Sequence, residues 1–301
     1  MNSRKPIQSR YIGPVSVPKV HSHGLDAAEF TSDAALAEVL DRYPRHLFDI
    51  NCYSFDDKGD HKLTTGERGD LSGADLVAAI RNGELWVNLR SIELGWPELW
   101  AVASDSFGDI AENYPRLNAV KRSGQLIISS PKTKVPYHFD ASGVVLFHMR
   151  GRKRLFVYPG DEEHLPEQAM ERVVARQTTE ELPYRSEFER DAQVFDLMPG
   201  EALVWPLYVP HRVENLDAFC VSLSMDYQTW GSRMRTGALY THAVLRERGF
   251  VPKHTDSLGK SALAIRWGAS LLLRRTGVLR SKLELIERSF VPDAVQGSRP
   301  V

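Results

Sequence analysis

Residues 138–159 read HFDASGVVLFHMRGRKRLFVYP, and residues 195–215 read FDLMPGEALVWPLYVPHRVEN. In each stretch, short runs rich in Val, Leu and Phe alternate with a glycine-containing turn, Arg150-Gly151 in the first and Pro199-Gly200 in the second. Similar runs precede and follow them, at 125–130 and 218–227. Many short strands separated by turns predict a β-barrel or β-sandwich.

Both stretches carry residues that can bind a metal. His138 and Asp140 form an H-x-D pair, and His211 follows in the second stretch. Because residues two apart on a strand point to the same face, His138 and Asp140 are predicted to reach one metal from the start of a strand. His211 follows a strand and the turn at Pro210, so a neighbouring strand could present it beside them. An H-x-D tripeptide alone is a weak signal for a metal site. Here predicted strands adjoin both the H-x-D pair and His211, and this context strengthens the signal.

Two histidines and one carboxylate are the ligand set of the facial triad. That arrangement suits non-haem iron(II) and leaves coordination positions open for a cosubstrate and O₂. Zinc or nickel could bind the same ligands, so the sequence does not identify the native metal.

These motifs carry a resemblance to a known family. The first stretch resembles the metal-binding strand pair of jumonji-C and cupin-like oxygenases, which read H-x-D, a strand and then G-x-K-R. The second resembles their L-x-P-G-D-x-L-x-x-P-x-x-x-x-H segment. The likeness covers about residues 72–228 and is strongest to the branch that contains the asparaginyl hydroxylase of the hypoxia-inducible factor. It implies a mainly β fold with flanking helices: a double-stranded β-helix, or cupin/jelly-roll barrel, with N-terminal helices and a C-terminal helical region.

The resemblance also implies an activity. The chain is expected to be an iron(II)- and 2-oxoglutarate-dependent dioxygenase, with iron bound by His138, Asp140 and His211. It would use O₂ to convert 2-oxoglutarate to succinate and CO₂ and would hydroxylate a protein side chain or a small molecule. Because family members also demethylate methylated lysines, the sequence leaves open both the substrate and the choice between hydroxylation and demethylation.

In the family, a lysine 13 residues after the aspartate binds 2-oxoglutarate, and this position is Lys153. Lys153, Leu155 and Val157 are spaced two residues apart, so their side chains are expected on one face of a strand. If that face points inward, the lysine needs an anionic partner, because an unpaired buried charge is costly. The alternative is an exposed lysine in a basic turn. Val135 stands where the branch has a threonine, and Thr133 could replace it.

The remaining candidates for the cosubstrate lie on two strands. Leu146 lies two residues after Val144, so both side chains are expected on the same face of the strand that follows Asp140. Val144 stands where the branch often has asparagine. In the last strand, Ser224 and Asp226 lie on a polar face that alternates with an apolar face. If the polar face looks into the barrel, both could contact cosubstrate or support the metal. If it faces solvent, they have no special role.

The chain is predicted to divide into three parts. Residues 1–24 are an irregular lead-in, residues 25–230 are the oxygenase domain with a barrel core at about 84–228, and residues 231–301 are a basic helical region. Spacing and capping residues predict helices at 31–42, 71–82, 93–112, 234–248 and 258–275, a loop at 56–70 and a polar insertion at 160–192.

Charge and composition bear on partners and location. The net charge is −1, but residues 231–282 hold 11 Lys or Arg against two acidic residues. Such a run is either a solvated helix face or a surface for an acidic partner, and nucleic acid is the less favoured choice. Apolar positions on these helices are expected to pack on the barrel or to form a homodimer. Two cysteines, no apolar stretch of about 20 residues and no signal peptide predict a cytoplasmic protein without a membrane span.

Two other functions remain open. A cupin-type metal- or ligand-binding regulatory protein could keep the barrel and lose turnover, and the apolar residues Val135 and Val144 favour it slightly. A metal-dependent isomerase would also use a cupin barrel, but those enzymes usually bind metal through more histidines. Lys153 separates the cases, because the oxygenase requires it and a binding protein does not.

Overall fold

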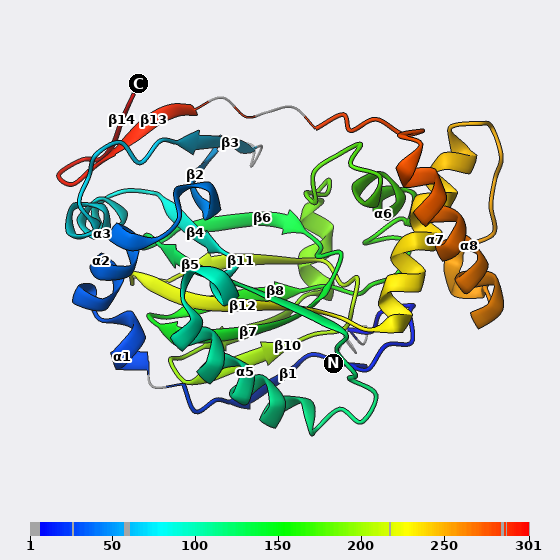
Figure 1. Ribbon diagram of the computed structural model, residues 1–301, viewed down its shortest axis with the longest axis horizontal. Helices are drawn as coiled ribbons and strands as arrows, with labels where there is room; N and C mark the ends of the chain where they lie inside the picture. Colours follow the sequence, from blue (N-terminus) through cyan, green and yellow to red (C-terminus); the bar gives the residue numbers. More distant parts are fainter. Residues whose placement is uncertain are drawn as a thin grey trace.

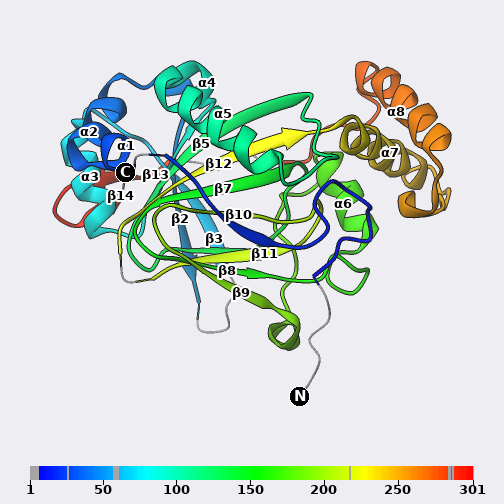
Figure 2. The ribbon, with the colours of Figure 1, turned by 90° about the horizontal axis from the view of Figure 1, so that it is seen from below.

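The computed structural model describes residues 7–25, 27–56, 61–216, 218–283, 286 and 288–300. Within them, two sheets face each other as the walls of a barrel, with helices packed outside (Figures 1 and 2). The larger sheet has the order β1 (Lys19–Ser22), β10 (Glu201–Val204), β7 (Gly143–Arg150), β12 (Cys220–Gln228), β5 (Lys121–Ser129), β4 (Trp86–Arg90), β2 (Phe48–Phe55), β3 (His61–Gly66), β13 (Arg288–Asp293) and β14 (Gly297–Pro300). The smaller has the order β6 (Lys134–His138), β11 (His211–Asn215), β8 (Lys153–Val157) and β9 (Gln193–Leu197).

The barrel itself is built from β5 to β12. Strands β10, β7, β12 and β5 form one wall and β6, β11, β8 and β9 the other, and every pairing between these neighbours is antiparallel. Successive strands from β5 to β12 alternate between the two walls, except that β8 and β9 are neighbours in the smaller one. This is the arrangement of the double-stranded β-helix, so the predicted fold class is confirmed.

Strand β7 has a core on both of its faces. Val144 and Leu146 point into the barrel and belong to the interior cluster, whereas Val145 and Phe147 belong to the outer cluster beneath the helices. A strand buried on both faces reads as a continuous apolar run, which is why VVLFHM shows no polar alternation.

Helices cover the outer face of the large sheet and one end of the barrel. The first group is α1 (Ala27–Thr31), α2 (Asp33–Arg42), α3 (Gly73–Asn82), α4 (Ile92–Gly95) and α5 (Pro97–Ala111). The second group is α6 (Glu167–Val174), α7 (Trp230–Arg246) and α8 (Lys260–Arg275). Short 3₁₀ helices occupy Arg45–Leu47, Ser186–Asp191 and Thr255–Ser257. No helix among the described residues is long and apolar enough to span a bilayer.

Capping residues fix where two predicted helices begin. The Ser32 side chain accepts a hydrogen bond from the Ala35 N–H at the start of α2, and Ser72 accepts one from the Asp75 N–H at the start of α3. These bonds satisfy amide groups that have no partner inside the helix. The helix expected at 93–112 is divided instead. Proline restricts the residue before it, and Trp96, which precedes Pro97, leaves the helical conformation with φ −149° and ψ 71°.

Three further expectations are corrected at the edges of the large sheet. The predicted loop at 56–70 contains β3, the irregular lead-in 1–24 contains β1, and the predicted helical region 231–301 ends in the β13–β14 hairpin. Residues 1–6, 57–60, 284, 285, 287 and 301 of these segments lie outside the described residues. Most residues of β1 and β3 are exposed or half-buried, so their sequences lack the apolar alternation by which a strand is recognised.

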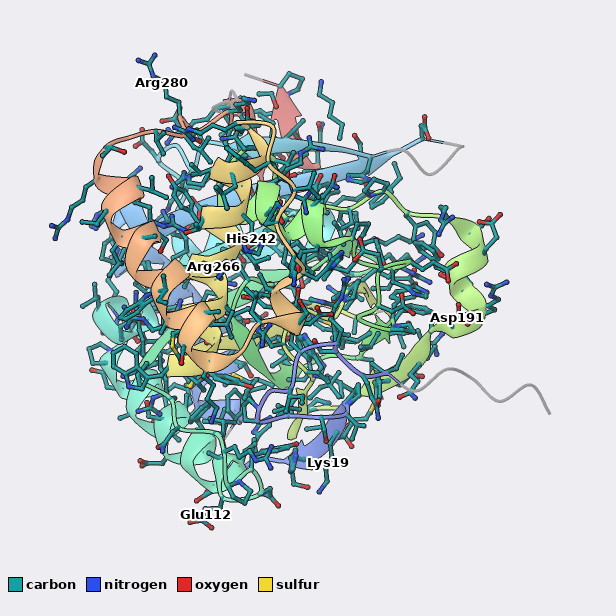
Figure 3. The ribbon with its side chains drawn as sticks, turned by 90° about the vertical axis from the view of Figure 1, so that its right-hand side faces the viewer. Lys19, Glu112, Asp191, His242, Arg266 and Arg280 are labelled. Carbon is teal, nitrogen blue, oxygen red and sulfur yellow. The ribbon has the colours of Figure 1, made fainter. Side chains whose placement is uncertain are left out.

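Helices α7 and α8 turn part of their positive charge inward. Arg246 Nε donates to Glu171 Oε2 of α6 at 2.6 Å, and Arg266 Nε lies 3.0 Å from Nε2 of the buried His242 (Figure 3). Arg274 stacks on the Tyr240 ring at 3.9 Å. Part of the basic run therefore fastens α7 to α6 and α8 to α7, a use that neither sequence interpretation included.

Helix α3 packs so closely on α2 that one position requires glycine. A Cβ atom on Gly73 would lie 1.9 Å from the carbonyl oxygen of Ala37, whereas a Cβ on Gly108 in α5 would have nothing within 4 Å. We expect Gly73→Ala to lower the free energy of unfolding by about 1–3 kcal/mol, because the helices must move apart. Gly108→Ala should leave it unchanged or raise it by up to about 1 kcal/mol through helix propensity. Urea unfolding of both variants measures this, and equal midpoints would contradict the close contact.

Candidate metal centre and its cavity

Three side chains converge at one end of the barrel. His138 is the last residue of β6, Asp140 lies two residues further on, and His211 is the first residue of β11. His138 lies opposite His211 across the antiparallel pair, and the two ring centroids are 4.2 Å apart. Asp140 Oδ2 is 3.4 Å from His211 Nε2, and one ligand atom from each residue lies within 4.8 Å of the others. The predicted metal-ligand set is thus brought together.

The local backbone differs from the expectation in one respect. His138 and Asp140 do not open a common strand, because β6 ends at His138 and β7 begins only at Gly143. The strand pleat therefore does not align the two side chains. The pairing of β6 with β11 positions the histidines, and the turn after β6 brings in Asp140.

Backbone carbonyl groups orient both imidazole rings. His138 Nδ1 is 2.8 Å from the Pro136 oxygen, and His211 Nδ1 is 3.3 Å from the Val209 oxygen. Because a carbonyl can only accept, each Nδ1 carries the proton and each Nε2 keeps its lone pair for a metal. Burial lowers the pKa of His211 well below its ordinary value, and the neighbouring His138 lowers it further. His211 is therefore neutral and ready to coordinate.

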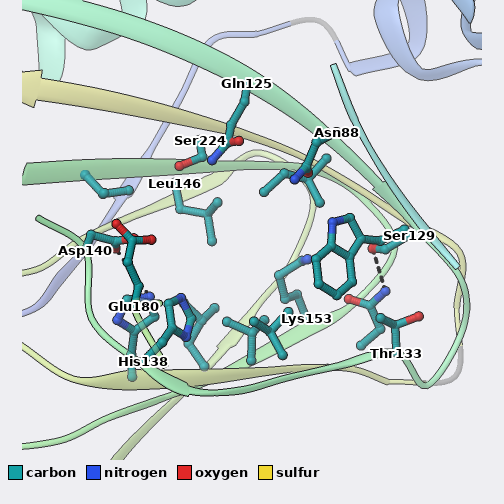
Figure 4. Close-up of a pocket in the computed structure, with 18 of the residues that line it drawn as sticks. Asn88, Gln125, Ser129, Thr133, His138, Asp140, Leu146, Lys153, Glu180 and Ser224 are labelled. Carbon is teal, nitrogen blue, oxygen red and sulfur yellow. Dashed lines mark hydrogen bonds and ion pairs between the residues drawn. The ribbon is translucent and has the colours of Figure 1, made fainter. Parts of the chain in front are cut away.

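The three residues open into a cavity of about 290 Å³ between the two sheets (Figure 4). His138 and Asp140 lie at one end and Lys153 toward the other. The remaining lining residues are Trp86, Asn88, Gln125, Ile127, Ser129, Thr133, Val135, Val144, Leu146, Leu155, Glu180, Trp205, His211, Val213, Asn215 and Ser224.

Lys153 is a buried cation that lines the cavity. The residue is 5% exposed, and within the described parts of the chain no carboxylate lies within ion-pairing distance of its Nζ. Burial lowers the pKa of this ammonium group. Of the two sequence interpretations, the inward orientation is the one observed. A buried cation without a partner is costly, so the cavity favours an anionic ligand at this end.

The other candidates for the cosubstrate surround Lys153 or lie across from it. Thr133 lines the cavity, and its Oγ1 is buried with no hydrogen-bond partner among the described residues. Val135, Val144 and Leu146 add apolar walls. Thr133 thus offers a free hydroxyl where Val135 cannot.

The polar face of β12 looks into the barrel. Ser224 is 6% exposed and lines the cavity, while the apolar positions of β12 pack under the helices. Asp226 does not line the cavity but lies near the metal end. Burial and the charge of Asp140 raise the pKa of Asp226 to about 7. Of the two orientations open from the sequence, the inward one is observed.

Sequence reasoning missed Glu180, which comes from the polar segment 160–192. Its carboxylate reaches the metal end of the cavity beside Asp140 (Figure 4). Desolvation in the cavity, with the charges of Asp140 and Asp226, raises the pKa of Glu180 to about 8. Nothing in the local sequence distinguishes Glu180 from the other glutamates of that segment. Asn88 was also missed. It lies two residues after Trp86 on β4, so the two side chains point to the same face, and this spacing could have indicated an inward polar position.

Comparison with known proteins agrees with the barrel. Residues 81–230 match the family model of the cupin-like domain. No curated protein matches the sequence significantly. Among solved structures, the ribosomal oxygenase YcfD of Escherichia coli superposes with a TM-score of 0.48 at 14% identity, covering 93% of this chain and 71% of that one.

Two further structures mark the range of the likeness. YcfD in complex with cobalt and 2-oxoglutarate gives a TM-score of 0.47 at 16% identity, with 91% and 70% of the chains covered. A protein of unknown function from Streptococcus pyogenes, SPY1581, gives 0.24 at 9% identity, with 36% and 65% covered. These values are too low to transfer any property of those proteins to this chain. The family match and the two-walled barrel together identify residues 81–230 as a cupin-like domain.

Proposed function

We propose that the protein is an iron(II)- and 2-oxoglutarate-dependent oxygenase. One observation carries the proposal: one cavity holds a two-histidine, one-carboxylate cluster at one end and, at the other, a buried lysine that has no counter-ion among the described residues. The cluster suits a metal with open positions, and the lysine suits a dianion that reaches from the metal across the cavity.

The metal would be held by His138, Asp140 and His211. The donor set fits iron(II), because two neutral imidazoles and one carboxylate leave a net positive centre for an anionic cosubstrate. When bound, iron(II) supplies the activation of O₂ that is coupled to decarboxylation of 2-oxoglutarate and to attack on a C–H bond. Burial raises the pKa of Asp140, and the same burial would strengthen its attraction to a cation.

The protein's own residues would bind and orient 2-oxoglutarate. Lys153 pairs with the distal carboxylate, and the Thr133 hydroxyl donates a hydrogen bond to the same group. Ser224 and Leu146 shape the wall opposite the metal ligands, and Asp226 supports the metal end. Trp205 packs on the His211 ring with centroids 4.9 Å apart and keeps water from that side of the ligand.

Location and outcome are part of the same proposal. We infer a cytoplasmic protein, because Cys52 and Cys220 are both free thiols. Hydroxylation of a protein side chain or of a small molecule is the proposed outcome, and demethylation would require the substrate's methyl group to reach the same position.

Loss of a metal ligand should abolish metal binding. We expect His211→Ala to weaken binding of Co(II) or Mn(II) by about 100-fold or more, since a ligand contributes more than the groups that orient it. Calorimetric titration without oxygen measures this. His46→Ala, an exposed histidine in the 3₁₀ helix Arg45–Leu47, should bind as the unaltered protein does. Equal affinities in all three proteins would exclude this metal site.

Loss of the buried charge should weaken the cosubstrate. We expect Lys153→Met to raise the Kd for 2-oxoglutarate of the Mn(II)-loaded protein by about 10- to 150-fold, the value of one charged hydrogen bond. The variant should be at least as stable as the unaltered protein, because it removes an unpaired buried charge. Lys134→Met, an exposed lysine on β6, is the matched control.

Turnover separates the oxygenase from a cupin-type binding protein. Iron-dependent succinate formation from 2-oxoglutarate, absent in His138→Ala, would support the oxygenase. Metal binding without either succinate or 2-oxoglutarate binding would reject it and favour the binding protein.

We also infer a homodimer through α8. Ile265, Gly268 and Leu272 lie on one face by their spacing, and Ile265 and Leu272 are 71% and 66% exposed. Leu271 beside them is 47% exposed. Glycine at the centre of the stripe would let the same helix of a second copy approach closely.

A charge on this stripe should separate the copies. We expect Leu272→Glu to shift the protein from dimer to monomer in light scattering after gel filtration. Val295→Glu changes an apolar residue of the β13–β14 turn that is 82% exposed, and it should leave the dimer intact. A monomer in the unaltered protein at high concentration would refute the inference.

A further inference from the structure

A second cavity lies outside the barrel, and we call it the basic groove. It has a volume of about 280 Å³. Its walls are residues 11–14, the start of β7, the end of β12 and the N-terminal turns of α7 and α8, together with Arg116 from the loop after α5. Figure 1 shows the end of β12 and both helices at the end of the barrel where β6 ends. The groove therefore lies at the metal end of the molecule.

The basic groove and the metal centre share one loop. Gly143 lines the groove, and the metal ligand Asp140 lies three residues earlier. Tyr227 of β12 packs on this wall so closely that a Cβ atom on Gly143 would lie 2.3 Å from its ring. Three residues span at most about 11 Å, so a polypeptide that contacts Gly143 needs only about four extended residues to reach the metal end.

Three cations line the basic groove, and no described carboxylate does. They are Arg116, Arg235 and Lys260. Within the described residues, the exposed side chains of Arg116 and Lys260 make no hydrogen bond or ion pair. Arg235 is held in place, because it donates to the Thr255 oxygen at 3.2 Å and its guanidinium stacks on the Tyr11 ring at 4.1 Å. A groove lined by charges of one sign concentrates their potential and attracts the opposite charge.

Helix α8 adds to this positive potential. It begins at Lys260 after Gly259, which has no side chain that could accept from the amide groups of the first turn. Lys260 and Leu263 of this turn both line the groove. The helix dipole and the uncapped amide groups therefore favour an anion at the same place as the three cations.

The rest of the lining indicates the kind of anion. A nucleic acid would need exposed aromatic rings on which its bases could stack, but the aromatic residues of the groove, Tyr11 and Tyr227, are each 3% exposed. Aliphatic walls beside cations suit a polypeptide that carries both apolar and acidic side chains. The aliphatic and thioether side chains of the groove are Ile12, Pro14, Leu207, Met234 and Leu263.

We propose that the basic groove binds an acidic, apolar segment of a polypeptide substrate and so places a residue a few positions away beside the metal. The inference rests on the proposed oxygenase function and narrows its substrate to a polypeptide. The proposed dimer leaves the groove accessible: Lys260 precedes Ile265 of the dimer stripe by five residues, which is about 140° around the helix.

Peptide binding tests the groove without metal or turnover. Two fluorescent pools of short peptides share random aliphatic positions and differ at the remaining ones, which are glutamate in one pool and glutamine in the other. In fluorescence anisotropy we expect the acidic pool to bind about tenfold or more tightly, and salt should reduce the difference. The double variant Arg116→Glu/Lys260→Glu should lose the preference. Arg275→Glu, an exposed arginine in the last turn of α8, is the matched control and should keep it.

Two kinds of result would overturn the inference. Equal binding of the pools, or a preference that persists in the double variant, would show that the groove does not select acidic peptides. A single-stranded RNA that binds more tightly than the acidic pool, and loses this binding in the double variant, would assign the groove to nucleic acid instead.

The position of the peptide relative to the metal is a separate measurement. Acidic peptides with a single fluorine label are bound to the Mn(II)-loaded protein, and the paramagnetic ion broadens the fluorine signal of a nearby label. We expect the greatest broadening for a label about four residues from the nearest glutamate. His211→Ala should remove the broadening and keep the binding. Broadening that does not depend on the label's position would overturn the substrate role.

Succinate formation by the unaltered enzyme, without any peptide, tests the oxygenase function independently. Its absence together with intact binding of the acidic pool would reject the oxygenase alone. Its presence together with equal binding of the two pools would reject the acidic substrate alone.

Discussion

The site depends on the register of one strand pair. His138 and His211 are far apart in the chain, and they meet because β6 and β11 pair with these two residues opposite each other. A slip of one residue would turn either histidine to the other face of the sheet. The smaller sheet prevents this slip, because β11 is also paired along its length with β8, from His211 opposite Val157 to Asn215 opposite Lys153.

The same pairing sets the length of the cavity. Since β8 runs beside β11, the histidine at one end of β11 and the lysine opposite its other end are separated by the five residues of one short strand. A strand rises about 3.3 Å per residue, so the metal ligands and Lys153 stand roughly 13 Å apart along the sheet, and their side chains lean into the space between. Register and strand length thus define which ligands can touch both ends. The burial that makes Lys153 costly in isolation also makes the cavity selective for an anion.

Much of this arrangement could be predicted from the sequence, and the rest could not for physical reasons. The strands buried on one or both faces, the caps Ser32 and Ser72 and the three metal ligands all leave local patterns. Strands β1, β3 and β13 lie toward the edges of the large sheet and leave none. Glu180 reaches the cavity only because a polar segment folds back along β6, and that is a tertiary event. The specific likeness to the asparaginyl hydroxylase branch stays a prediction.

The chain crosses the molecule once more after its helices. Strand β13 pairs in parallel with β3, at the opposite end from α7 and α8 (Figures 1 and 2). On a ribosome, β2 and β3 therefore emerge with one side of β3 unpaired, and that edge stays open until more than 200 further residues have been made. Open edges are where chains join to one another. During synthesis, the free edge of β3 is thus exposed to association with other nascent chains for most of the elongation time, until the carboxyl-terminal hairpin has been made.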